Sequence, residues 1–332
     1  MKLGAYTACL HDRPLEQALD LLAELGLTSA EVNTGGFLPA PHVPIESILA
    51  SDSARDDYLG LYDKAGIALT GLNCNGNPLH PDPAVGTVQA EDLRRSIEVA
   101  SRLGVKRIVT MSGLPAGEAS GERVNWVVNP WNTTLLESIE YQWEVLVPFW
   151  KDIQARAADA DVKIAIELHP HNTVFNPATF LRLAEAIDST HVGVEMDPSH
   201  LFWQGMDPVA VVDHLGEWIF HAAAKDIKIY EDSVKINGVL DERFTRIPLE
   251  DDPLPVGGRY TVTRWPANPT WEFVALGQGH DNAYWTRFLQ ALHRVDPDMA
   301  VNIEHEDQHF DRVEGLRLAA ENLKAAYTAA GI

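Results

Sequence analysis

The alternation of short apolar runs with helical segments constrains the fold more than any other feature of this chain. Between the runs lie segments whose apolar residues recur at helical spacing, such as 14–26, 90–104 and 178–188. Runs that are apolar on both faces and separated by helices are typical of a parallel sheet covered by helices. The strands are expected at residues 2–7, 29–33, 67–73, 105–111, 162–168, 191–197, 218–226 and 299–305.

Eight strand–helix units predict an α/β fold of the (β/α)8 TIM-barrel type, formed as a single domain over residues 1–332. A doubly wound open sheet is the alternative, but no GxGxxG motif follows the first strand. Residues 229–280 form an insertion between the seventh and eighth strands that is rich in Pro, Gly, Trp and charge. A plain loop of this length is uncommon, so we expect the insertion to cover the barrel rim or to form a subunit contact.

The composition narrows the class of protein. A formal net charge of −22 argues against a nucleic-acid partner, because binding to phosphates requires a basic surface. No apolar run is long enough to span a membrane, and the N-terminal segment lacks the apolar stretch of a signal peptide. Cys9 and Cys74 are the only cysteines, too few for a disulfide framework. We therefore expect a cytoplasmic protein.

Four of the later strands carry ionisable residues at or near their ends: Glu167, Asp197, His221 and Glu304. In a barrel the carboxyl ends of the strands meet at one rim, where the active sites of this fold lie. Three carboxylates and an imidazole would repel one another or become protonated there unless a cation bound them. The set therefore predicts a site for Mn²⁺, Mg²⁺, Co²⁺ or Zn²⁺, ions that accept mixed oxygen and nitrogen ligands.

On these residues the sequence resembles a known family. The glutamates that end strands five and eight, the DPSH motif at 197–200 and the HAAAKD segment at 221–226 are similar to motifs of the sugar phosphate isomerase/epimerase family. The members of that family are xylose isomerase-like TIM barrels, and the resemblance extends over essentially the whole chain.

The resemblance implies a metal-dependent site. It implies one divalent ion, most often Mn²⁺, held by Glu167, Asp197 and Glu304, with His200 as a substrate contact beside the metal. The fourth ligand is usually the second histidine of an HxHxKD segment on strand seven, where this chain has Ala223. Two alternatives follow from this departure.

Either His221 binds the metal from a shifted strand, which we favour, or another group such as His169 completes the shell. His169 and His171 follow Glu167 at alternating positions, and alternation on the strand would direct all three to the same side. The two histidines are candidate bases with a pKa nearer neutrality than a carboxylate, or else they hydrogen-bond a ligand carboxylate.

The chemistry that the resemblance implies is removal of a proton next to a metal-bound carbonyl of a sugar or keto-sugar, leading to isomerisation or epimerisation. In the ketose epimerases of the family two metal-binding glutamates act as acid and base, which would assign those roles to Glu167 and Glu304. Further candidates for substrate binding are Trp131 and Trp203, since indole faces stack on sugar rings. Lys225, on the HAAAKD segment, is another candidate. Packing under a lid is the other explanation for the tryptophans.

Residues 166–183 and the insertion also resemble, more loosely, the larger (alpha) subunit of bacterial C-glycoside deglycosidases. That resemblance implies a lyase that cleaves 3-keto glycosides by elimination and pairs with a small second subunit. A non-catalytic sugar-binding protein is a third alternative. An apurinic-site endonuclease with three zinc ions shares the barrel, but the acidic charge argues against it. The expected partners are a sugar or glycoside substrate and further copies of the chain in a homo-oligomer.

Overall fold

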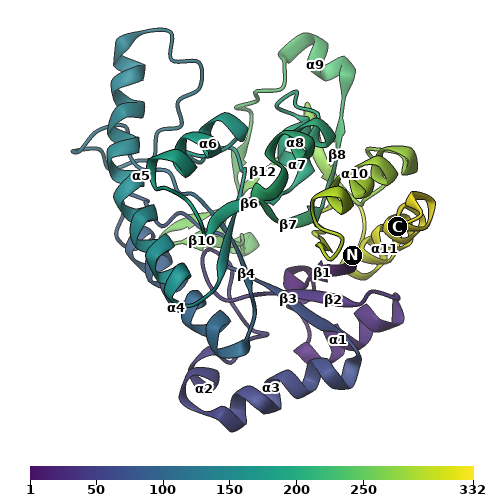
Figure 1. Cartoon of the computed structure of the whole chain (residues 1–332). Coiled ribbons are helices and arrows are strands. Elements are labelled where there is room, and N and C mark those ends of the chain that lie inside the picture. Colours follow the sequence, from purple (N-terminus) through teal and green to yellow (C-terminus); the bar gives the residue numbers. More distant parts are fainter.

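The computed structural model describes residues 1–332 and shows eight parallel strands closed into a barrel, with helices around it (Figure 1). Neighbouring strands follow the order β1-β14-β7-β6-β5-β4-β3-β2, so the last strand closes onto the first. The predicted (β/α)8 barrel is confirmed, and its closure excludes the open doubly wound sheet. The strands are β1 (Lys2–Tyr6), β2 (Ser29–Asn33), β3 (Ala68–Asn73), β4 (Arg107–Met111), β5 (Lys163–Glu167), β6 (Val192–Met196), β7 (Ile219–Ala224) and β14 (Ala300–Ile303).

The helices begin where the sequence supplies capping residues. Asn176 accepts a hydrogen bond from the Thr179 amide and Asp207 accepts one from the Val209 amide, each just before a proline at the first helical position. None of the helices combines the length and apolar character needed to cross a membrane. The main helices are α1 (Leu15–Glu24), α2 (Ile45–Ala50), α3 (Asp52–Ala65), α4 (Gly86–Leu103), α5 (Thr133–Asp159), α6 (Pro177–Ala186), α7 (Pro198–Phe202), α8 (Pro208–Leu215), α10 (Asn282–Val295) and α11 (Arg312–Ala330).

The core consists of the strands and the inner faces of these helices. Every residue of β2, β6 and β7 is buried, as expected for strands enclosed on both faces. Trp150 of α5 and Trp285 of α10 are fully buried, and the Trp150 indole donates a hydrogen bond to the Ser112 carbonyl after β4. The N-terminal strand β1 pairs with β14, the last strand of the chain, and the N and C labels appear near each other in the view of Figure 1. The buried strands and the helices packed on them therefore fix the positions of the strand ends.

The seventh strand is shorter than predicted. The expected strand over 218–226 ends at Ala224, and Asp226 instead begins a new strand, β8 (Asp226–Ile229). The physical reason is the buried Asp226 carboxylate, which accepts hydrogen bonds from the amides of Gly277, Gly279 and His280. Asp226 therefore joins the start of the insertion to its end.

The insertion is folded rather than a plain loop. Strand β8 pairs in antiparallel fashion with β13 (Trp271–Val274), and α9 (Glu231–Asn237) and four strands of two or three residues lie between them. Gln89 donates a hydrogen bond to the Val256 carbonyl, and the Tyr260 ring packs 5.2 Å from that of His80. His80 and Gln89 follow β3, which lies opposite β7 in the barrel order. The small strands are β9 (Thr245–Arg246), β10 (Pro255–Gly257), β11 (Tyr260–Thr261) and β12 (Thr263–Arg264).

Candidate functional site

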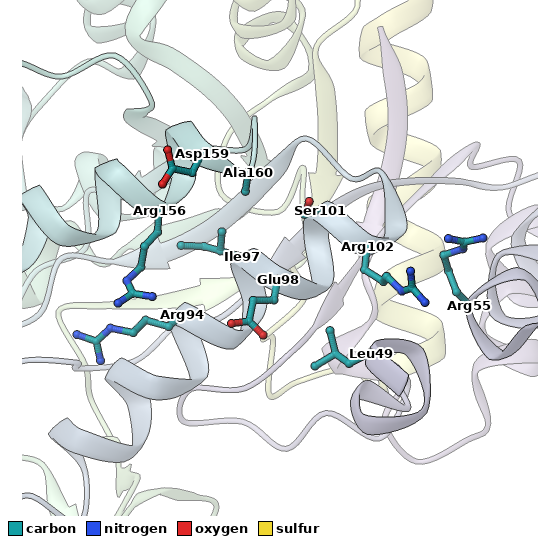
Figure 2. Close-up of a pocket in the computed structure, with 10 residues that line it drawn as sticks. All are labelled: Leu49, Arg55, Arg94, Ile97, Glu98, Ser101, Arg102, Arg156, Asp159 and Ala160. Atoms are coloured by element: carbon teal, nitrogen blue, oxygen red, sulfur yellow. The ribbon is translucent and has the colours of Figure 1, made fainter. Parts of the chain in front are cut away.

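One well-defined cavity does not lie at the strand ends. It has a volume of about 630 Å³ and is lined by four arginines on the outside of the barrel (Figure 2). Arg94 and Arg156 both form salt bridges with Asp152, and Arg102 and Arg55 form salt bridges with Asp52. Arg94 also pairs with Glu91 and Arg55 with Asp56, so every arginine has a carboxylate partner. The cavity lies toward the C-terminal ends of α4 and α5, away from the rim where the strands end. We therefore exclude it as the catalytic site.

Three carboxylates converge at the rim instead. Glu167 is the last residue of β5, Asp197 follows β6 directly, and Glu304 follows β14. One oxygen of each lies within 4.8 Å of the others, and their side chains are almost completely enclosed. Asp197 is also the N-cap of α7, where it accepts a hydrogen bond from the Ser199 amide. The barrel thus brings together three of the four residues expected to bind a metal.

The imidazole closest to these carboxylates is that of His200, in the first turn of α7. Its Nε2 lies 2.9 Å from Glu167 Oε1 and 3.4 Å from Asp197 Oδ2, yet neither contact has the geometry of a hydrogen bond. His169 lies beside it, with ring centroids 4.0 Å apart. Nitrogens of His169 and His200 and an oxygen of Glu167 also lie within 4.8 Å of one another.

Two neutral or positive groups hold the carboxylates in place. Asn75, after β3, donates a hydrogen bond of 2.6 Å to Glu167 Oε2. Lys225, directly after β7, donates to Glu304 Oε2 at 2.8 Å and to Glu306 Oε1 at 2.9 Å. The ring of Phe273 from the insertion covers the lysine, with Nζ 4.5 Å from the ring centroid.

The negative charge exceeds what these partners neutralise. Burial raises the pKa of Asp197 to about 7, with Glu167 adding to the rise and Lys225 opposing it. Burial also raises the pKa of Glu304, again against the effect of Lys225. Burial acts to raise the pKa of Glu167 too, but His200, His169 and Lys225 together outweigh it and the pKa is lowered. Asp197 and Glu304 therefore resist ionisation beside an ionised Glu167, and a bound cation would stabilise the ionised form of all three.

The donor set fits a divalent cation. Asp197 Oδ2 and His200 Nε2 are both buried and lack hydrogen-bond partners, although they lie 3.4 Å apart. Carboxylate oxygens with one imidazole nitrogen are the ligands that Mn²⁺, Mg²⁺ and Zn²⁺ accept. The identity of the ion, with Mn²⁺ favoured, stays a prediction.

His221 lies in a second buried group, deeper in the barrel. Its Nε2 is 2.6 Å from Glu31 Oε2 on β2, and Asn302 on β14 donates to the same carboxylate oxygen at 3.2 Å. Glu195 on β6 lies within 4.8 Å of both His221 and Glu31, and burial raises its pKa. Gly71 on β3 makes room for this pair, since a Cβ there would lie 3.3 Å from His221 Cε1. Metal binding by His221 stays a prediction, and in this structure its Nε2 is engaged with Glu31.

Two of the remaining expected residues, His171 and Trp203, line an aromatic pocket near the carboxylates. Strand β5 ends at Glu167, so the strand alternation expected to direct His169 and His171 to the same side as Glu167 does not extend to these histidines. His171, with a left-handed backbone (φ 61°), turns its ring toward Trp126. Trp203, after α7, is buried and lines the same pocket. Trp131 is 87% exposed and lies outside it.

Sequence reasoning missed several residues at the rim and in the barrel interior beneath it. Asn75 lies in the NCNGN segment after β3, and its amide is the only signal that the sequence offers there. Glu31 is a lone carboxylate within an otherwise uncharged strand, which is a signal of a buried partner. Phe273 could not be placed, because nothing in the sequence tells which part of the insertion folds back over the strand ends.

Comparisons with known proteins agree with this architecture. The family described as xylose isomerase-like TIM barrel matches residues 19–326. A protein of Bacillus subtilis (strain 168), named uncharacterized protein YfiH, is 35% identical over 328 residues, which is 98% of each chain. The solved structure of 3-keto-D-glucoside 4-epimerase, YcjR, from E. coli has a TM-score of 0.65 at 12% identity over 99% of each chain. The IOLI protein with a bound zinc atom has a TM-score of 0.63 at 18% identity, again over 99% of each chain. These two structural likenesses show the shared fold.

Proposed function

The chain belongs to the xylose isomerase-like TIM barrel family, and from this premise we propose that it is a divalent-metal-dependent enzyme of the sugar isomerase/epimerase type. It removes a proton from the carbon next to a carbonyl group of a sugar or keto-sugar. The observation that carries the proposal is the convergence of Glu167, Asp197 and Glu304 within 4.8 Å at the strand ends. The likeness to a 3-keto-D-glucoside epimerase and to a zinc-binding barrel supports it.

In this proposal Glu167, Asp197 and Glu304 hold the ion, and His200 supplies the nitrogen ligand. His200 takes the place left open by Ala223, because its Nε2 is already beside two of the carboxylates. A divalent ion bound there polarises the carbonyl oxygen and so acidifies the adjacent C–H group. Asn75 fixes the orientation of Glu167 through the hydrogen bond to Oε2.

In this proposal two carboxylates beside the ion, Glu167 and Glu304, carry out the proton transfers. Glu167 and Glu304 come from β5 and from the end of β14, so they face a bound sugar from different strands. One carboxylate accepts the proton and the other returns it, which is general acid–base catalysis. His169, whose ring lies 4.0 Å from that of His200, is the alternative base. Lys225 stabilises negative charge, because Glu304 and Glu306 raise its pKa against the effect of burial and keep it protonated.

We propose that the insertion covers the rim. Phe273 contacts both the Lys225 ammonium and the His200 ring, the latter at 5.8 Å between centroids. The contacts of Gln89 and Tyr260 extend the insertion to the opposite side of the barrel. Such a cover keeps water from the carboxylates and strengthens electrostatic interactions beneath it.

A lyase is the second candidate, and one observation favours it. The aromatic pocket beside the carboxylates gives room for a group attached to the sugar. Removal of the same proton can then lead to expulsion of that group instead of reprotonation of the sugar. Both reactions share the first step, so the first experiment tests that step.

The test is exchange of substrate hydrogen with solvent deuterium, followed by NMR with ketohexoses and 3-keto glucosides in the presence of Mn²⁺. The proposal predicts exchange by the wild-type protein and its loss in Glu167→Gln and Glu304→Gln. Glu144→Gln, on the exposed face of α5, is the matched control and should exchange normally. Epimerised sugar supports the epimerase and a released aglycone the lyase, whereas no exchange with either substrate class contradicts the proposal.

A further inference from the structure

A second compartment adjoins the carboxylate site. It is a cavity of about 480 Å³ formed by the insertion and by the segments that follow β4, β5 and α7. Its volume lies in the range of small-molecule sites, about 300–1,000 Å³. Its aromatic walls are Trp126, Trp203, Phe244, Trp265 and Trp271.

The walls present flat rings in fixed orientations. Trp203 and Trp271 stack with centroids 5.1 Å apart and planes only 10° from parallel. Trp265 meets Trp271 edge to face at 4.9 Å, and Phe244 packs on Trp265 at the same separation. Packing of each ring on the next leaves little freedom to collapse into the cavity, and rigid aromatic faces bind ring systems by stacking.

The compartment lies one aromatic ring away from the carboxylates. The Phe273 ring is 5.8 Å from that of His200 on one side and 6.0 Å from that of Trp265 on the other. His171 lines the cavity, two residues along the chain from His169. A molecule with one ring at the carboxylates therefore has its second ring within reach of the tryptophans.

The charge of the lining excludes anions. No lysine or arginine lines the cavity, and its charged members are Asp241 and Glu242. Asp241 is paired with Arg243, and Glu242 is exposed. A phosphate or carboxylate group would find no positive partner there, whereas an uncharged ring would find mainly apolar surface.

We infer that this compartment binds an uncharged ring joined to the sugar, so that the substrate is a glycoside rather than a free or phosphorylated monosaccharide. The inference rests on the proposed function for the position of the sugar at the carboxylates. The attached ring is aromatic or a second sugar, because both stack on indole faces.

The experiment measures binding, so it needs no turnover. Calorimetry measures the affinities for phenyl glucoside, a glucosyl disaccharide, methyl glucoside and glucose 6-phosphate, and for their 3-keto derivatives. The wild-type protein should bind the phenyl glucoside or the disaccharide at least tenfold more tightly than the methyl glucoside. The phosphate should give no gain over the methyl glucoside. The first two ligands distinguish an aromatic ring from a second sugar.

Variants assign the preference to the compartment. Trp265→Ala and Phe244→Ala should each bring the affinity for the two-ring ligand down toward that for methyl glucoside. Because two separate positions are tested, misfolding of one variant does not decide the result, and circular dichroism checks that each variant is folded. Ile236→Ala, in α9 of the same insertion and 84% exposed, should keep the full preference.

Equal affinity for one-ring and two-ring ligands, or a preference unchanged in both pocket variants, overturns the inference. Its failure can be told apart from failure of the proposed function. A preference for two-ring ligands without any deuterium exchange would contradict the proposed enzyme activity but support ring binding in the compartment. Exchange with free ketoses and no such preference would support the activity but contradict ring binding.

Discussion

His200 Nε2 lies 2.9 Å from Glu167 Oε1, and neither side chain is more than 2% exposed. Burial and the neighbouring His169 lower the pKa of His200 to about 3, so the imidazole is neutral at pH 7. A neutral ring nitrogen without a hydrogen bond, placed against an ionised carboxylate, supports the proposal that the two side chains share a cation. By contrast, His221 is hydrogen-bonded to Glu31.

The first prediction separates the two histidines. His200→Ala should weaken Mn²⁺ binding by about tenfold or more, because a nitrogen ligand is lost. His221→Ala should keep the metal affinity but lower the free energy of unfolding by about 1–3 kcal/mol, because it leaves the Glu31 carboxylate buried with fewer partners. Calorimetric titration with Mn²⁺ and chemical denaturation measure the two effects. If His221→Ala abolishes metal binding while His200→Ala leaves it intact, His221 and not His200 is the nitrogen ligand.

The second prediction tests the closure of the barrel. A Cβ at Gly4 on β1 would overlap the backbone carbonyl of Ser29 on β2 and the side chain of Asn302 on β14, both of which are buried. Gly4→Ala should therefore lower the free energy of unfolding by about 1–3 kcal/mol or more. Gly60→Ala is the matched control: it lies within α3 with nothing near its Cβ, and helix propensity predicts a gain of about 1 kcal/mol. Equal stability of the two variants in urea would contradict the strand arrangement.

The fold could be predicted because the barrel strands are short apolar runs and helices such as α1, α4 and α6 carry apolar residues at helical spacing. The positions of Glu167, Asp197 and Glu304 followed from the rule that strand ends share one rim. The partner of His221 could not be predicted, because the distance between β2 and β7 across the barrel interior depends on which side chains fill it. The same holds for Asn75 and for the aromatic wall, which depend on loop paths that no periodic pattern describes.

The third prediction concerns acid stability. Burial, with a contribution from His42, lowers the pKa of His11 to about 4, from about 6.5 in an unfolded chain. The folded state thus takes up this proton less readily than the unfolded state. The resulting stability is present above pH 6.5 and is lost as the pH falls from about 6.5 to 4.

His11→Gln should flatten the pH dependence of the unfolding free energy over this interval. The exposed His214→Gln serves as the control and should follow the wild type. Thermal or urea unfolding at a series of pH values gives the slopes. A slope for His11→Gln as steep as that of the wild type would show that other groups cause the acid sensitivity.

The metal content of the purified protein tests the central claim most directly. Elemental analysis after dialysis against Mn²⁺, repeated for Asp197→Asn, measures the number of ions held at the rim. The account predicts one divalent ion per chain in the wild type and loss of that ion in Asp197→Asn, with an unchanged circular dichroism spectrum. A wild-type protein that binds no ion, or an Asp197→Asn variant that keeps it, would contradict the claim that Glu167, Asp197 and Glu304 form a metal site.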